Sequence, residues 1–157
     1  MRRGGAEKIQ RSGLDLAFLL VRRAFWYDEA VKAFTAVTEI ELDCAIGYWG
    51  MAMSRWYPLW YPPNAAALKA GSEAVEKAVA AKPKTDRERD YIAAIAIFYR
   101  DNDKIDHRTR AIAYEKAMEQ VHLKYPDDRE AGVFYSLACS RRRRPPIRPT
   151  PIRRRHA

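Results

Sequence analysis

Residues 26–43 read WYDEAVKAFTAVTEIELD, and their apolar positions follow a helical period. Apolar side chains recur at steps of three, four and three residues, at Tyr27, Ala30, Phe34 and Val37. This spacing places the four side chains on one face of an α-helix. The stretch therefore predicts a helix with one core-facing side, and it decides the fold class for the sequence around it.

The same helical period continues on both sides of this stretch, and strand-like alternation is absent from the sequence. Helices are expected at about 14–41, 44–56, 65–81, 85–99, 106–125 and 129–139. Their connections are short and contain proline or polar residues, so consecutive helices should pack as antiparallel hairpins. The sequence therefore predicts an all-α fold of roughly six helices.

Residues that favour helix N-termini precede most of these segments. Asp43, Asn64 and Asp106 are candidate single caps, and the pairs Thr85 with Glu88 and Asp127 with Glu130 have capping-box spacing. Pro126 follows the fifth segment and should end it. These residues set the expected helix starts and one expected stop.

Residues 26–43 resemble the second helix of a tetratricopeptide repeat. The four residues on the core-facing side, which we call the stripe, stand at the aromatic and small positions of that family: Tyr27, Ala30, Phe34 and Val37. Leu42 stands where the family usually has proline. Residues 45–52 resemble the start of the next repeat, with Tyr48 at the first aromatic position and Ala52 at the small one. The resemblance is to bacterial members of the family.

A looser copy of the pattern ends in Met118, Val121 and Pro126. The spacing from Leu42 to Pro126 is not a whole number of ~34-residue repeats, so the middle repeat must be irregular. The resemblance implies a short α-solenoid of antiparallel helix–turn–helix pairs over residues 13–139. It also implies a non-catalytic module whose concave face binds proteins or peptides.

The net charge of +9 comes from the ends of the chain. Residues 141–157 hold eight arginines and no acidic residue, whereas residues 12–140 hold 17 basic and 19 acidic residues. The slightly acidic body argues against nucleic-acid binding by that part. We expect residues 1–12 to be a disordered basic N-terminus and residues 140–157 a disordered Arg/Pro-rich tail.

Two interpretations of the tail stay open. It could contact phosphate backbones or anionic surfaces without sequence preference, because it has no aromatic residues for base stacking. Alternatively, residues 140–154 can be written with legal codons so that the neighbouring frame encodes a helix end, a loop and a helix start. The chain would then be a frameshifted, truncated product with no independent function.

The segment 55–63 is the most unusual local feature, because it repeats Trp-Tyr-Pro. Its aromatic rings could form a platform for a peptide, or they could fold over the helices and fill the core. For the binding interpretation the candidate contact residues are Tyr48, Arg55, Trp56, Trp60 and Tyr61.

No pattern in the sequence points to catalysis or to a cofactor. The acidic segment 101–106 lacks the glycine and the bidentate glutamate that a calcium loop requires, so no metal site is expected. Cys44 and Cys139 belong to no metal or redox motif. We therefore expect neither an enzyme nor a metalloprotein.

The last predicted helix has no obvious partner after it. Val133, Phe134 and Leu137 should therefore form an exposed apolar edge that favours self-association. No apolar run is long enough to span a membrane, and the N-terminal segment makes a poor signal peptide. The default expectation is a cytoplasmic location.

Overall fold

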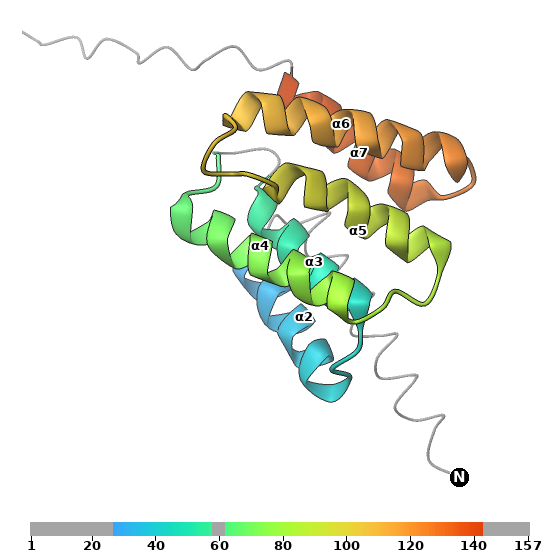
Figure 1. Cartoon of the computed structure of the whole chain (residues 1–157). Helices are drawn as coiled ribbons and strands as arrows, with labels where there is room; N and C mark the ends of the chain where they lie inside the picture. The colour runs from blue at the N-terminus through green and yellow to red at the C-terminus, as the bar shows by residue number, and fades with distance from the viewer. Residues whose placement is uncertain (1–26, 58–61, 143–157) are drawn as a thin grey trace, which may run out of the picture.

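The computed structural model describes residues 27–57 and 62–142, and it arranges them as α-helices without strands (Figure 1). The six helices are α2 (Tyr27–Ile40), α3 (Ala45–Trp56), α4 (Ala65–Ala80), α5 (Asp86–Tyr99), α6 (His107–Lys124) and α7 (Arg129–Arg142). The all-α prediction is confirmed for this part of the chain. The expectations for residues 1–26, 58–61 and 143–157 lie outside the described residues.

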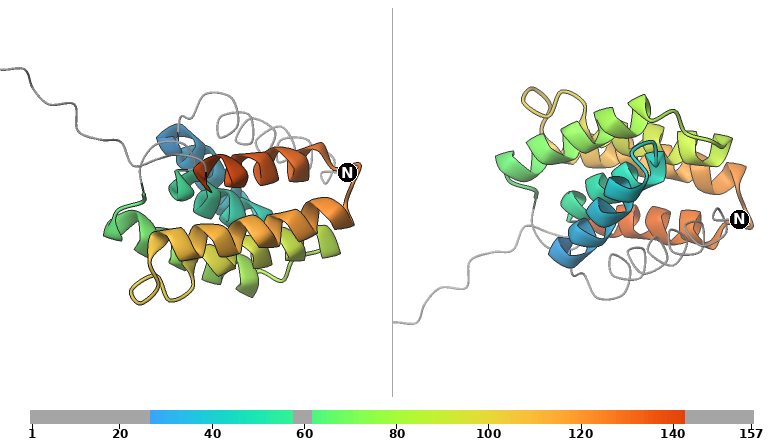
Figure 2. Two further views of the ribbon diagram at one scale, coloured as in Figure 1. Left: turned by 90° about the horizontal axis from the view of Figure 1, so that it is seen from above. Right: turned by 90° about the horizontal axis from the view of Figure 1, so that it is seen from below.

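Each helix packs against the next along the chain, and α3 also contacts α5. Contacts at the two ends of α5 and α6 show that these helices run antiparallel, because Asp90 bonds Lys124 while the Phe98 carbonyl bonds Arg110. Both views in Figure 2 place α3 in the middle of the molecule. The main core lies around α3, and Ala30 and Phe34 of α2 form a second, small cluster beside it.

α3 is enclosed on every side, since none of its residues is exposed. Its largest side chains, Trp49 and Trp56, each have 1% of their surface exposed. A helix that is apolar around its whole circumference is stable only when it is fully buried. The sequence AIGYWGMAMSRW of α3, with a single charged residue, fits this position.

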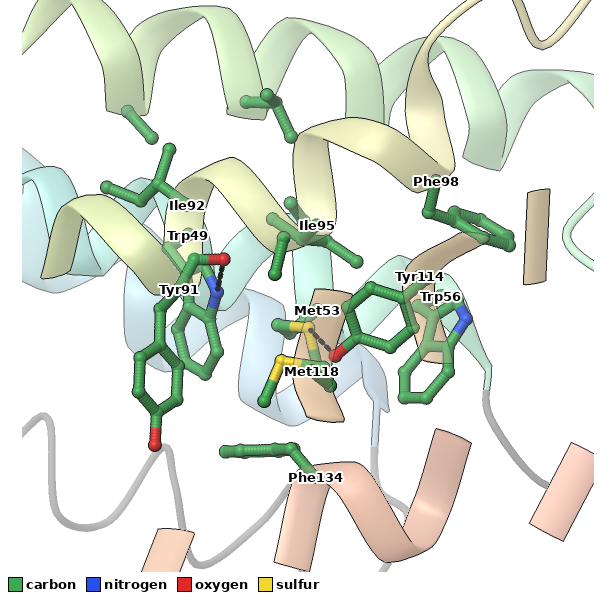
Figure 3. Close-up of a cluster of buried hydrophobic side chains, with 14 of the residues drawn as sticks. Trp49, Met53, Trp56, Tyr91, Ile92, Ile95, Phe98, Tyr114, Met118 and Phe134 are labelled. Carbon is green, nitrogen blue, oxygen red and sulfur yellow. Dashed lines mark hydrogen bonds between the residues drawn. The ribbon is translucent and has the colours of Figure 1, made fainter. Parts of the chain in front are cut away.

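Aromatic rings connect α3 to the helices around it (Figure 3). The ring of Trp49 meets those of Tyr91 and Phe134 edge-on, with centroids 5.4 and 5.3 Å apart, and its Nε1 donates to the Tyr91 carbonyl at 3.1 Å. Further along α3, the ring of Trp56 meets that of Tyr114 on α6 edge-on, with centroids 4.6 Å apart. Edge-to-face pairs of this kind add about 0.5–1.5 kcal/mol each beyond the burial of their area.

The opening stripe is buried as expected. Tyr27, Ala30, Phe34 and Val37 are at most 9% exposed, and the other packing residues named from the repeat pattern, Ala52, Met118 and Val121, are at most 5% exposed. Pro126 is different, because it is exposed beyond the end of α6. Its predicted packing role is wrong.

Most of the predicted helix caps are present. The side chain of Asn64 accepts from the N–H of Ala67 at 2.8 Å, and that of Thr85 accepts from the N–H of Glu88 at 3.1 Å. The Glu88 carboxylate accepts from the N–H of Lys84 rather than from that of Thr85. The return hydrogen bond of the capping box is therefore made to the residue before the N-cap. Asp106 accepts from two N–H groups at the start of α6.

Two predicted caps are wrong. Cys44, not Asp43, stands at the N-cap of α3 and makes no side-chain cap bond. At α7 the cap is Asp128 rather than Asp127, because the Asp128 carboxylate accepts from the N–H of Glu130 at 3.0 Å. Tertiary contacts explain why Asp128 takes this position, since Arg87 and Tyr91 of α5 donate two further hydrogen bonds to its side chain.

The expected apolar edge on α7 is also corrected. Phe134 is 1% exposed because it fills the space beside Trp49 and Tyr91. Val133 and Leu137 are half-buried, and Leu137 packs against the core cluster. The described part of α7 therefore does not present the apolar edge that was expected to drive self-association.

Two glycines allow close helix packing. A Cβ at Gly50 would lie 2.2 Å from the ring of Phe34, and one at Gly71 would lie 2.2 Å from the ring of Tyr99. The Tyr99 hydroxyl continues past α4 and donates to the Ala52 carbonyl at 2.7 Å. Tyr99 therefore joins α5 to α3 across the backbone of α4, and it needs a residue without a side chain at position 71.

Gly71→Ala should lower the free energy of unfolding by about 1–3 kcal/mol, because the new methyl group overlaps the buried ring of Tyr99. The matched control is Gly132→Ala, where the nearest atom to the new Cβ is 3.5 Å away. That change should stabilise α7 by up to about 1 kcal/mol through helix propensity. Urea unfolding of both variants measures the difference, and equal effects would contradict the packing described.

Candidate functional site

None of the three predicted contact residues that the structure describes is exposed. Tyr48 and Arg55 are half-buried, and Trp60 and Tyr61 lie outside the described residues. Trp56 packs between Phe98 and Tyr114 in the core, so its assignment to a contact surface is corrected. For Trp56 the alternative interpretation, that the ring fills the core, is the one that its burial fits.

A first polar cluster ties α5 to the turn before α7. The carboxylate of Asp128 accepts from Arg87 Nε at 2.6 Å and from the Tyr91 hydroxyl at 2.7 Å. The Arg87 guanidinium also lies over the Tyr91 ring, 4.8 Å from its centroid. Charge-assisted bonds of this type are shorter and stronger than neutral ones.

A second cluster contains the same kinds of group, but α5 supplies the carboxylate instead of the cation and the tyrosine. Here the carboxylate is on α5, where Asp90 accepts from Lys124 Nζ at 2.6 Å and from the Tyr125 hydroxyl at 2.7 Å. Each cluster thus joins a carboxylate, a cation and a tyrosine hydroxyl. Together they fix α5 to the end of α6 and to the start of α7.

The pKa of both carboxyl groups is lowered. Burial is the largest influence and acts to raise the pKa of Asp90 and Asp128, but the hydrogen bonds and charges of the neighbouring groups outweigh it. A carboxyl group whose pKa is lower in the folded state stabilises that state above its unfolded pKa. This stabilisation is lost as the pH falls through the folded pKa.

Stability should therefore decrease as the pH falls below about 4, the ordinary aspartate pKa. Asp128→Asn should cost about 1–3 kcal/mol at pH 7 and should reduce the loss of stability between neutral and acidic pH. The measurement is urea unfolding as a function of pH. Asp103→Asn, in the exposed turn after α5, is the control and should leave the profile unchanged; an identical profile for Asp128→Asn would refute the role of the cluster.

The described part of the chain carries a groove between α5 and α6, which lie side by side in Figure 1. It has a volume of about 220 Å³, and each helix contributes four residues: Asp90, Ala93, Ala94 and Ile97 from α5, and Ala117, Gln120, Val121 and Lys124 from α6. Most of its lining is apolar. The Asp90–Lys124 ion pair lies at one end, where each charge neutralises the other.

The charges of α6 are divided between its two sides. Both of its glutamates turn toward α7, where Glu119 accepts from the Tyr135 hydroxyl at 3.1 Å and Glu115 lies 4.0 Å from Cys139 Sγ. Lys116, Gln120 and Lys124 are spaced by four residues and therefore share the other side. Of these three, Gln120 and Lys124 border the groove.

Sequence reasoning missed this site. Val121 was expected in the core, and Ala93, Ala94 and Ala117 were not singled out. Their small size on helix faces that meet was the available signal, since small residues on neighbouring helices leave a depression. Which faces stay uncovered depends on the positions of α4 and α7, and the sequence does not give these directly.

Within residues 27–57 and 62–142, no cluster of three or more His, Cys, Asp or Glu side chains could hold a metal ion. Neither Cys44, which is buried, nor Cys139, which is half-buried, is part of a disulfide bond. Among the helices of the same two segments, none combines the length and apolarity needed to cross a bilayer.

Comparison with known proteins gives no relative. No family model matches the chain, and neither a curated protein nor a solved structure is significantly similar to it.

Proposed function

We propose that the chain is a short tetratricopeptide-like solenoid that binds a protein or peptide without catalysing a reaction. The groove between α5 and α6 is the binding site. The observation that carries this proposal is an apolar depression of about 220 Å³ bordered by the polar side chains of Asp90, Gln120 and Lys124. An apolar floor with a few polar groups at its border is typical of sites that take a side chain from a partner.

The packing supports the repeat-like part of the proposal. Each helix contacts its neighbours in the chain, and α3 also contacts α5, as stacked helical hairpins require. Small residues stand where helices approach closely, at Gly50 against Phe34 and at Gly71 against Tyr99. These contacts fit the resemblance drawn from residues 26–52.

The burial of α3 supports a site on a different face from the one first expected. Since no residue of α3 is exposed, its side chains serve the core, and a partner must use the outer helices. The floor residue Ala93 is exposed, whereas the neighbouring Ala94 is 2% exposed. A partner can therefore reach the groove from solvent without displacing a helix.

The size of the groove indicates a weak, reversible interaction. A partner that covers one groove buries far less than the ~1,600 Å² of a standard protein interface. Its affinity should come from one or two aliphatic side chains in the groove, each worth about 1.5–3 kcal/mol when fully buried. Contacts with the polar groups at its border, Asp90, Gln120 and Lys124, would then determine the orientation of the partner.

Selection from a random peptide display library tests the proposal. The chain should enrich peptides that bind it, and Ala93→Glu should weaken their binding about tenfold or more by placing a charge on the apolar floor. Ala36→Glu, the same change at an exposed position of α2, is the matched control and should bind as the unaltered chain does.

Fluorescence anisotropy with the selected peptides gives the dissociation constants, and circular dichroism checks the folding of both variants. Peptides that bind Ala93→Glu as tightly as the unaltered chain would refute the groove as the site. Failure to enrich any peptide would refute peptide binding as the function.

A further inference from the structure

The negative charge of the folded part is concentrated on α2 and the turn that follows it. Residues 27–44 hold five acidic residues and one lysine, whereas residues 45–140 hold 13 acidic and 14 basic residues. The rest of the described helices are therefore close to neutral. We call this region the acidic face, and it consists of Asp28, Glu29, Lys32, Glu39, Glu41 and Asp43 with the aliphatic Ile40 and Leu42.

Most side chains of the acidic face are open to solvent. Asp28, Lys32 and Glu39 are exposed, and their spacing of four and seven residues places them on one side of α2. The opposite side of the helix packs on α3. At the end of the face, Ile40 is 65% exposed and Leu42 is 77% exposed. The face therefore combines carboxylates with accessible aliphatic side chains.

The nearby lysines neutralise only part of this charge. Lys32 bonds the Glu29 carboxylate at 2.8 Å, and Lys84 bonds that of Glu41 at 2.5 Å. Even when Lys84 is counted, five carboxylates face two lysines, which is a net charge of −3. The other three acidic residues form no ion pair within the described part of the chain: Asp28, Glu39 and Asp43.

Helix stability does not explain the charge of Glu39. This residue stands in the last turn of α2, which contains no basic residue. The helix dipole makes a carboxylate unfavourable at that end and a cation favourable. A cationic partner on the acidic face would remove this penalty.

The chain itself contains a segment of complementary chemistry. Residues 143–157, which lie outside the described residues, hold six arginines and no acidic residue. Ile147 and Ile152 stand between the arginines, as Ile40 and Leu42 stand between the carboxylates of the acidic face. Guanidinium groups form short, charge-assisted hydrogen bonds with carboxylates, so both the charges and the aliphatic side chains can pair.

This segment follows α7 at the end of the molecule where α2 begins. The last turns of α7 lie beside the first half of α6, since Cys139 Sγ is 4.0 Å from the Glu115 carboxylate. The first residue of α2 lies beside the end of α3, because the rings of Tyr27 and Tyr57 meet with centroids 5.0 Å apart. Both views in Figure 2 show the end of α7 and the start of α2 at the same end of the molecule.

The segment is also long enough to follow α2. It contains four prolines, and a polyproline chain rises ~3.1 Å per residue, so residues 143–157 can span about 45 Å. Two helix spacings of ~10 Å each separate α7 from α2 across α3. α2 has 14 residues and is therefore about 21 Å long. The remaining length thus covers the whole helix.

We propose that residues 143–157 dock on the acidic face of the same chain. Each exposed ion pair is weak, but a tethered segment has an effective concentration in the ~mM range, so several pairs together hold it. The docked arginines are unavailable to phosphate groups, and the contact is therefore autoinhibitory toward polyanions. The inference does not use the groove between α5 and α6 and is independent of the proposed function.

Trypsin digestion of the full chain tests the proposal, because the rate of cleavage after Arg153 and Arg154 follows the population of the undocked segment. The triple variant Asp28→Asn, Glu39→Gln, Asp43→Asn should be cleaved about threefold faster or more at ~50 mM salt, since docking is lost. Mass spectrometry measures the released fragments. An isotope-labelled peptide of residues 143–157 in the same solution corrects for the effect of salt on trypsin.

A second triple variant is the matched control. Glu73→Gln, Glu76→Gln, Asp103→Asn removes the same number of exposed carboxylates from α4 and from the turn after α5, and it should be cleaved as the unaltered chain is. At ~500 mM salt all three chains should be cleaved at one rate. Circular dichroism checks that both variants fold.

DNA binding gives a second measurement. A labelled duplex of ~20 base pairs should bind the acidic-face variant about threefold or more tightly than the control variant, because the arginines are released while the net charge of the two variants is equal. Fluorescence anisotropy gives both dissociation constants.

Four results would overturn the inference: equal cleavage of the two variants at low salt, cleavage of the unaltered chain that does not change with salt relative to the peptide, equal DNA affinities, or protection that rises with protein concentration. The last result would place the segment on a second copy. Peptide binding through Ala93 is measured separately, so the proposed function stands or falls independently of these results.

Discussion

The fold depends on the burial of α3. Its two tryptophans supply the largest side chains of the core, and they contact α5, α6 and α7 through edge-to-face ring pairs. The hydrogen bond from Trp49 to the Tyr91 carbonyl also satisfies the one polar atom that this indole brings into the core. A polar group buried without such a partner would cost about 1–3 kcal/mol.

The position of the groove follows from this burial. Because α3 occupies the inner faces of α5 and α6, their outer faces are left to meet solvent. The cluster around Asp90 then holds the two helices in register at one end. At the other end, Arg110 is 4% exposed and donates to the carbonyls of Phe98 and Ile105, which joins α6 to the end of α5. The groove therefore lies between two helices that are fixed at both ends.

Much of the fold could be predicted from local patterns. The stripe in residues 26–43 and the caps at Asn64, Thr85 and Asp106 depend on neighbours in the sequence, and the structure agrees with them. The caps at Asp43 and Asp127, the exposed edge at Phe134 and the contact role of Trp56 were wrong. The last three depend on contacts with distant helices, and periodicity within one segment carries no such information. The groove was missed for the same reason, because it exists only where the faces of α5 and α6 stay uncovered.

The dual role of Asp128 has a consequence for how this part of the molecule opens. One carboxylate holds the first turn of α7 and the cation and tyrosine of α5, so fraying of α7 would also release Arg87 and Tyr91. Stacked helical arrays often lose their end helices independently, as a nearest-neighbour chain does. Here α7 and α5 are coupled through a single side chain, so amide protons in both should exchange with solvent in the same opening event.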